Sequence, residues 1–412
     1  MIEDTESVEA YRDRARTWIE ANLEPKVPGR ELTRAESLAL QAKLFDAGFA
    51  GFAYPREYGG QGLTFAHQSA FFAEAADYYV PTTSNVSIGM LGPVLLDMAS
   101  EELKEEHIPK ILRAEEDFIQ FLSEPGGGSD MAGATTRATR DGDTYVIYGS
   151  KIWSSGAATA THALCLCRTD GDVPKHRGLS LIIMPLIDTP GLTINPIHDF
   201  TASGSHFCQE FFDDVVVPVT NVVGEENEGW AAAQRILFHE RNATVGLGHG
   251  IGLTDRGDRR SAAAGTLARA QEMLQLAARR HNDPSVRYLA GRAYAVLAAH
   301  DMARQRVTVG QRTGDLVGQW ASLLKLGNGI LGPAMAELAM AIAGSNGVVW
   351  TDDEPGGDQG IAWLSSRGGS IGGGSNEMQR NIVTERLLGM PREHDPSREL
   401  PFNEIMRRRA RT

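Results

Sequence analysis

The chain has 412 residues, of which 53 are acidic and 40 are basic, and its formal net charge is −13. A chain of this length can bury a large core and is long enough for two or three domains. The negative balance argues against a general nucleic-acid-binding protein. Three cysteines, Cys165, Cys167 and Cys208, form neither a zinc quartet nor a thioredoxin motif, so no metal site is expected and a reducing cytoplasm fits.

The first 117 residues are predicted to form a helical domain, because apolar residues recur there at helical spacing. The acidic N-terminus lacks the basic and apolar regions of a signal peptide. Helices are expected over residues 7–23, 32–47, 65–79 and 94–112, with Gly48 as the C-cap glycine of the second.

Composition changes at Phe118, where short β-rich runs begin. Strands are expected over residues 118–122, 144–148, 151–155, 181–184 and 207–217, with the turn at residues 141–143 opening a hairpin. We therefore predict a small barrel-like β domain over residues 118–226.

From residue 227 the pattern is helical again, and the chain as a whole is predicted to be α+β. Helices are expected over residues 230–250, 265–281, 285–310, 317–343 and 376–388, which indicates a four-helix bundle over 227–395. The charged tail, 396–412, is predicted to be a solvated end, with a role at an interface as the alternative. The apolar run 331–349 carries Glu337 and several glycines, so we expect a buried helix and no membrane insertion.

Two segments suit a planar heterocyclic ligand. Residues 121–130 read FLSEPGGGSD, and three consecutive glycines let the backbone approach a ligand closely with its N–H groups free. Residues 151–155 read KIWSS, in which the indole of Trp153 suits stacking and the hydroxyls of Ser154 and Ser155 suit donation to ring nitrogens. The pair predicts a flavin cradle; the alternative is a flexible turn and a core aromatic residue.

These segments resemble the hallmarks of the acyl-CoA dehydrogenase family, and the resemblance extends over nearly the whole chain. It implies α,β-desaturation of an acyl-CoA thioester with FAD as cofactor, in lipid breakdown, and transfer of the electrons to an electron-transfer flavoprotein. It also implies FAD contacts from Phe121, Ser123, Gly128, Ser129, Trp153, Ser154 and Ser155, with Ser129 near the substrate as well.

The resemblance leaves two positions for the catalytic base. Many family members carry a glutamate before the last helix, where this chain has Gly373 in the run IGGGS. A subset, including isovaleryl-CoA and long-chain acyl-CoA dehydrogenases, carries it on the first bundle helix in a Glu-Arg pair, which matches Glu240-Arg241.

We expect Glu240 to be the base, because its neighbours three and four residues away are largely apolar and desolvation makes a carboxylate more basic. The alternative is a glutamate that merely pairs with an arginine. The resemblance implies that the Gly373 N–H binds the thioester carbonyl and that Phe238, Arg241 and Gly374 lie at the substrate. The missing glutamate favours a branched, cyclic or otherwise bulky acyl group.

The segment 375–389 closely resembles the family's C-terminal signature, which implies FAD contacts from Ser375, Asn376 and Glu377. Two departures concern contacts to the FAD of a neighbouring subunit. Arg279 stands in for the arginine of an Arg-x-x-Phe-Gly segment, and Ala341 replaces a glutamine ahead of the Gly344-Ser345 turn. An insertion over 253–265 is predicted to be a surface loop or, alternatively, a contact to CoA phosphates.

A homodimer or homotetramer is expected, or a heteromer with a related subunit that completes the FAD site. A flavin-dependent monooxygenase or oxidase on the same fold is the other alternative, since fold does not fix function.

Overall fold

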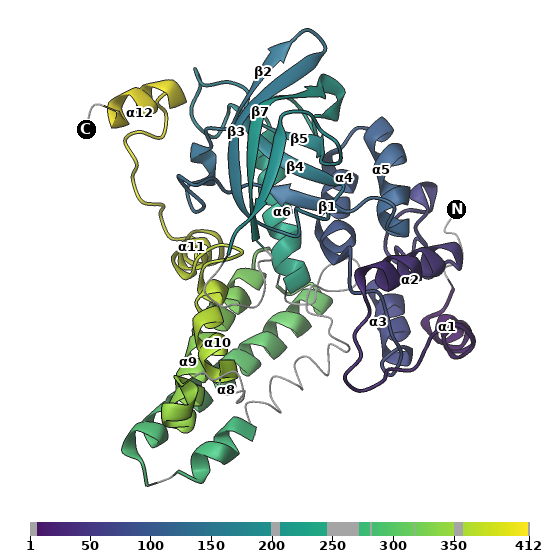
Figure 1. Cartoon of the computed structure of the whole chain (residues 1–412), viewed down its shortest axis with the longest axis vertical. Helices are drawn as coiled ribbons and strands as arrows, with labels where there is room; N and C mark the ends of the chain where they lie inside the picture. Colours follow the sequence, from purple (N-terminus) through teal and green to yellow (C-terminus); the bar gives the residue numbers. More distant parts are fainter. Residues whose placement is uncertain are drawn as a thin grey trace. The chain divides into compact units, whose positions relative to one another are not determined.

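The structure is a computed structural model that describes residues 6–198, 207–244, 272–280, 282–316, 318–349 and 357–410. The chain divides into two compact units. Unit 1 comprises residues 1–197, 206–258 and 395–412, and unit 2 comprises residues 198–205 and 259–394. Figure 1 shows both units and labels most of their helices and strands.

The N-terminal part of unit 1 is helical, as predicted, and Gly48 follows α2 with φ +73°. The predicted helix over 94–112 is in fact two helices, because Ala99 is extended and the Ser100 hydroxyl accepts from Leu103 N to cap a new helix. The elements are α1 (Val8–Asn22), α2 (Arg34–Asp46), η1 (Arg56–Tyr58), α3 (Phe65–Glu74), the π-helix η2 (Ser87–Leu91), α4 (Gly92–Met98) and α5 (Glu101–Arg113).

A sheet follows these helices and contains the predicted strands, although those expected over 144–148 and 151–155 form one continuous strand, β3. Within the described residues it has seven strands, in the order β1-β4-β2-β3-β7-β6 with β5 paired to β4. The long strands β3 and β7 are antiparallel, and β1 runs parallel to β4. The strands are β1 (Phe118–Phe121), β2 (Arg137–Asp141), β3 (Thr144–Ser155), β4 (His162–Arg168), β5 (Leu179–Pro185), β6 (Leu192–Pro196) and β7 (Phe207–Pro218).

Strand β1 separates two apolar cores. Phe118 and Leu122 lie in a core that also contains side chains of α6 (Gly229–Thr244) and of the N-terminal helices. Ile119 and Phe121 point to the opposite face and lie in the core enclosed by the curled sheet. Helix α6 thus packs against the sheet on the Phe118 side of β1 (Figure 1).

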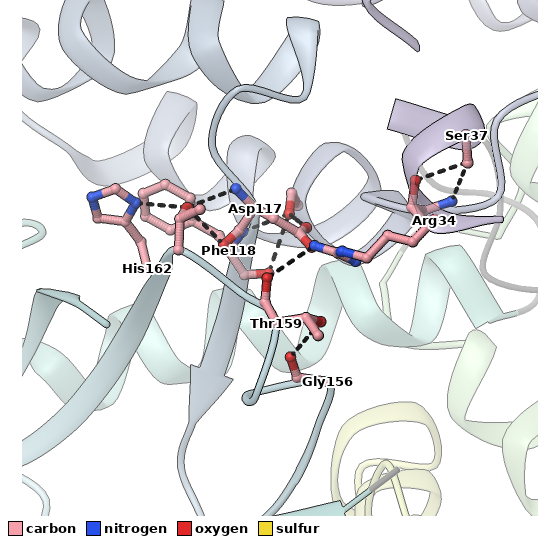
Figure 2. Close-up of polar contacts among 10 residues, drawn as sticks. Arg34, Ser37, Asp117, Phe118, Gly156, Thr159 and His162 are labelled. Atoms are coloured by element: carbon pink, nitrogen blue, oxygen red, sulfur yellow. Dashed lines mark hydrogen bonds and ion pairs between the residues drawn. The ribbon is translucent and has the colours of Figure 1, made fainter. Parts of the chain in front are cut away.

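Asp117 fixes the start of β1, as Figure 2 shows. Its carboxylate accepts from the Ser87 hydroxyl at 2.6 Å and from the Arg34 guanidinium at 2.7 Å, and its N–H donates to the Thr161 hydroxyl at 2.8 Å. Because these partners come from η2, α2 and the loop before β4, the strand is held to three separate segments at once.

Unit 2 is helical in its described part. The helix predicted over 376–388 is present as α11 continued by a π-turn, whereas α10 was not predicted. Helix α9 packs against α8, α10 and α11. The elements are α8 (Pro284–Thr313), α9 (Ala321–Ala343), η5 (Gly344–Gly347), α10 (Gly357–Ser366), η6 (Gly368–Ser370), α11 (Asn376–Ile382) and η7 (Val383–Leu387), and residues 272–278 are helical as well.

Some predictions lie outside the described residues. These are the end of the helix expected over 230–250, most of the one expected over 265–281, and the insertion over 253–265. The helix from Ala321 continues to Gly347 and is long and apolar enough to cross a membrane by length and composition alone. Core helices of soluble proteins meet the same criterion, and one face of this helix, including Leu331 and Leu338, is buried within unit 2.

The tail is not a solvated end, which corrects the prediction. Residues 395–412 belong to unit 1, and α12 (Phe402–Arg409) packs on the sheet domain. Phe402 is 6% exposed, its N–H donates to Val173 O at 2.9 Å, and the Arg168 guanidinium lies 4.0 Å from its ring centroid. The helix is short and strongly basic but amphipathic, because its two buried anchors, Phe402 and Ile405, lie three residues apart on one face.

A buried ion pair holds the loop that follows β1. The Lys151 ammonium on β3 is fully buried and lies 2.9 Å from Glu124 Oε1, and it also donates to Leu122 O at 3.1 Å. Glu124 further accepts from Thr135 N and Thr136 N. Burial by itself would raise the pKa of Glu124, but Lys151 and the threonine donors outweigh burial and lower that pKa to about 2.

A second buried carboxyl group lies on β7. Glu210 is fully buried and accepts a short hydrogen bond from the Ser154 hydroxyl, while its Oε2 has no hydrogen-bond partner among the described residues. Burial raises the pKa of Glu210 to about 7, against smaller opposing effects of Ser154 and Lys151.

Replacing Glu124 by Gln should destabilise the protein by about 3–5 kcal/mol at pH 7, because Lys151 is left as a buried cation without its carboxylate. The folded-state pKa of Glu124 is depressed, so its stabilisation is present above pH 4.5 and is lost as the pH falls toward 2. As the pH is lowered from 7 to 3, the unfolding temperature should therefore fall more steeply in the wild type than in E124Q. The exposed Glu225→Gln is the matched control, and a stability of E124Q equal to that control would contradict the prediction.

Replacing Glu210 by Gln should have the opposite dependence on pH. The folded-state pKa of Glu210 is raised, so its contribution is complete below pH 4.5 and is lost as the pH rises through about 7. At pH 8.5, E210Q should therefore unfold at a higher temperature than the wild type, with a free energy of unfolding up to about 3 kcal/mol larger. At pH 5 the variant should be no more stable than the wild type. Parallel curves for the two proteins across this range would show that Glu210 does not titrate as described.

Candidate active site

The glycine loop of unit 1 offers open space beside its backbone. No atom lies within 4 Å of where a Cβ on Gly126 would stand, and the nearest to one on Gly128 is the Ser123 hydroxyl at 3.5 Å. Not every N–H group is free, however, because Gly127 N donates to Glu124 O within the loop. Ser123 is partly exposed, and Gly128 and Ser129 are exposed, so these predicted FAD contacts lie at the surface of one loop.

Trp153 lies at a β-bulge and faces outward. The pairing of β3 with β7 shifts between Ile152 and Ser154, so Trp153 is the extra residue. Its φ is +68°, which is rare for a bulky side chain, and its indole is 56% exposed. A strained backbone that presents a large aromatic surface to solvent is typical of a binding site.

Two of the predicted FAD contacts have inward-facing side chains. The bulge turns Ser154 inward, where its hydroxyl donates to Glu210, and Phe121 is 1% exposed inside the sheet core beside Phe212. Neither side chain is available to a ligand, which corrects the prediction, and only their main chains remain candidates. Ser155, the next residue, is exposed.

Glu240 lies on α6 and contacts strand β1. Its helical neighbours Ile236 and Ala243 are fully buried, as the apolar pattern predicts, and Glu240 itself is half-buried. Its Oε2 is 3.4 Å from Nε2 of Gln120, the residue before Phe121 on β1. The predicted base and the strand that leads into the glycine loop are therefore in contact within unit 1.

The neighbours of Glu240 on α6 are held firmly. His239 Nε2 lies 2.8 Å from Asp97 Oδ2, and Arg235 bonds the same carboxylate. Burial would raise the pKa of Asp97, but the bonds to His239 and Arg235 lower it overall. Arg241 is 7% exposed and burial lowers its pKa, while Phe238 is half-buried beside Arg235. Substrate contacts of Phe238 and Arg241 stay predictions.

The second glycine loop lies in unit 2. Gly373 and Gly374 have φ of +67° and +89°, which only glycine adopts readily, and Gln379 Nε2 donates to both of their carbonyl groups. A Cβ on Gly374 would stand 2.6 Å from that nitrogen. The Gly373 N–H makes no hydrogen bond to another described residue, so the predicted donor to a thioester carbonyl is available.

Helix α9 anchors this loop. Lys325 Nζ donates to Gly369 O at 2.7 Å, and the side chains of Ser370 and Asn376 both donate to Gly329 O. The predicted FAD residues open α11: the Ser375 hydroxyl accepts from Met378 N as its N-cap, and Glu377 is exposed in the first turn. Both have structural roles here, and their FAD contacts stay predictions.

The arginine near the Gly344-Ser345 turn is Arg280 rather than Arg279. Arg280 Nη1 donates to the carbonyl groups of Ala341 and Ile342 at the end of α9, and a Cβ on Gly344 would be 3.7 Å from it. Arg279 is exposed on the preceding turn. The contact of Arg279 with the FAD of a neighbouring subunit stays a prediction.

One group of possible metal ligands occurs among the described residues. The ligand atoms of His107, Glu116 and His162 all lie within 4.8 Å of one another. His107 Nδ1 is 2.7 Å from Glu116 Oε2, and Lys110 Nζ is 3.1 Å from the other carboxylate oxygen. Because Lys110 already supplies a positive charge, internal bonding accounts for this cluster, which the sequence analysis did not identify.

Three family models match the chain in succession. Residues 5–115 match the N-terminal domain of acyl-CoA dehydrogenases, residues 120–215 the middle domain and residues 227–388 the C-terminal domain. The acyl-CoA dehydrogenase IpdE1 of Mycobacterium tuberculosis is 34% identical over 407 residues, which cover 94% of this chain and 99% of that protein.

Solved structures of similar proteins point to the same family. The Tcur3481-Tcur3483 steroid ACAD has a TM-score of 0.69 and 31% identity, covering 95% of this chain and 100% of that one. The ChsE4-ChsE5 complex from Mycobacterium tuberculosis has a TM-score of 0.66 and 26% identity, with coverage of 95% and 100%. With a helical N-terminal domain, a curled middle sheet and a helical C-terminal domain, this chain belongs to the acyl-CoA dehydrogenase family.

Proposed function

We propose that the chain desaturates an acyl-CoA thioester between its α and β carbons, with Glu240 as the base and FAD as the cofactor. The observation that carries the proposal is the place of Glu240: its carboxylate is half-buried and in contact with the strand that leads into the glycine loop. A carboxylate in such surroundings can remove the α proton of a thioester.

The residues of unit 1 fit a flavin. The exposed Trp153 offers a stacking surface, and the open loop at Gly126 and Gly128 leaves room for close approach. Ser123, Ser129 and Ser155 add hydroxyl groups along the same two segments. FAD, when bound, would accept the hydride from the β carbon.

A bulky acyl group is the proposed substrate class. Gly373 leaves no side chain where many family members carry a glutamate, and its neighbours are glycines too. Among the relatives, one solved structure is described as a steroid ACAD, and a protein of Syntrophus aciditrophicus, 32% identical over half of this chain, is described as a cyclohexane-1-carbonyl-CoA dehydrogenase. Both names denote ring-containing acyl groups.

We further propose a cytoplasmic oligomer that passes its electrons to an electron-transfer flavoprotein. A homodimer or homotetramer is the first candidate. A heteromer is the second, favoured by the departures at Arg279 and Ala341 and by similar structures whose descriptions name paired proteins.

Replacing Glu240 by Gln should lower the rate of anaerobic flavin bleaching by acyl-CoA at least about 10²–10³-fold, because the amide cannot take the α proton. The visible spectrum of bound FAD should be unchanged. Isobutyryl-CoA, cyclohexane-1-carbonyl-CoA and a steroid-side-chain acyl-CoA form the test panel, with the exposed Glu228→Gln as control. Full bleaching of E240Q would force another base, and rapid reoxidation by air without any bleaching would favour a monooxygenase or oxidase.

Purification of the chain alone tests its assembly. A homo-oligomer should be yellow, carry about one FAD per chain and show a multiple of the 44.6 kDa chain mass by light scattering. A colourless protein that takes up FAD only when co-expressed with a second family chain would instead establish the heteromer.

A further inference from the structure

Strand β1 carries one polar side chain on an otherwise apolar face. Phe118 and Leu122 of that face are 1% and 7% exposed and belong to the core shared with α6. Gln120 lies two residues from each, so the pleat turns it to the same side, toward the helix that carries Glu240. A carboxamide in this place is costly unless its polar atoms are bonded.

Only half of that carboxamide is bonded within the described residues. Nε2 lies 3.4 Å from Oε2 of Glu240, whereas Oε1 is buried and accepts no hydrogen bond there. Because nearly all buried polar atoms are satisfied, an acceptor left over beside the proposed base calls for an explanation.

We propose that Gln120 is a positioning residue that holds the Glu240 carboxyl group in both of its protonation states; the inference rests on the proposed function. Before the reaction, the Gln120 NH₂ group donates to the carboxylate. In the proposed reaction the α C–H bond breaks, its proton forms an O–H bond on Glu240 and its electron pair enters the new C=C bond, while FAD, when bound, would take the β hydride. A half-turn of the carboxamide then presents Oε1 as the acceptor for that O–H.

Glutamine suits this role better than a cation would. One end of its side chain carries a donor and an acceptor side by side, so it can bond an ionised or a protonated carboxyl group without moving its stem. A lysine in the same place would stabilise only the ionised form and so weaken the base. A purely apolar residue would complete the core but leave Glu240 without this partner.

Replacing Gln120 by Leu tests the inference, because leucine continues the apolar face and has neither donor nor acceptor. With the thioester of the panel that bleaches the wild type fastest, the limiting rate should fall about 10–100-fold, and the concentration giving half that rate should change less than about twofold. The acid limb of the pH–rate profile should move to higher pH, because the bond that Gln120 donates to the ionised carboxylate is charge-assisted and stronger than the bond it accepts from the protonated form.

Asp97→Asn is the matched control, since it removes the negative charge that pairs with His239 and Arg235 on α6 and leaves the contact of Gln120 with Glu240 in place. It should lower the unfolding temperature but keep the wild-type acid limb. A rate of Q120L within twofold of the wild type, or a loss of rate with an unmoved acid limb in both variants, would overturn the inference and leave Gln120 a structural residue. If no thioester of the panel bleached the wild type, the proposed function itself would be refuted, and the role proposed for Gln120 would be refuted with it.

Discussion

The buried ion pair between Glu124 and Lys151 is the interaction on which the geometry of the candidate site depends. It joins the loop after β1 to the middle of β3, and the Lys151 ammonium also bonds Leu122 O at the end of β1. Desolvating two charges is costly, so the pair is weak evidence for net stability, but loss of either partner would leave an uncompensated buried charge. The observed arrangement leaves Gly126 and Gly128 open while their loop is held at its base.

Successive residues in and around strand β1 make different contacts. Asp117 fixes its start, the side chains of Phe118 and Phe121 enter two different cores, and Glu124 fixes the segment beyond its end. Gln120, between these anchors, meets Glu240. Because both ends of the strand are restrained, the position of a contact in its middle is restrained as well.

Much of the fold could be predicted from periodicity and from glycine and turn residues, including α1, α2 and the β2–β3 hairpin. The rest depends on contacts distant in sequence. A strict alternation from Lys151 would place Trp153 inside, and only the bulge, a property of the pairing with β7, turns it outward and Ser154 inward. Lysine in a strand gives no sign of full burial, since its partner Glu124 is 27 residues away.

The parts of the candidate site that short sequence motifs identify could be predicted. The glycine loops and Glu240 are recognisable from short motifs, and the apolar neighbours Ile236 and Ala243 follow from helical spacing. The polar Gln120 within the apolar run Phe-Ile-Gln-Phe-Leu is a local signal that a pattern of strand residues alone does not explain. The docking of α12 depends on tertiary packing, because the spacing of Phe402 and Ile405 indicates an amphipathic helix but not the surface on which that helix packs.

The three thiol groups have a practical consequence for spectroscopy. Cys165, Cys167 and Cys208 are free and buried, and burial raises the pKa values of Cys165 and Cys208, so little reactive thiolate forms at neutral pH. A single cysteine introduced at a chosen surface position could therefore carry a maleimide dye or a nitroxide spin label while the native cysteines remain in place. The natural sequence is, in effect, already a background suited to single-site labelling.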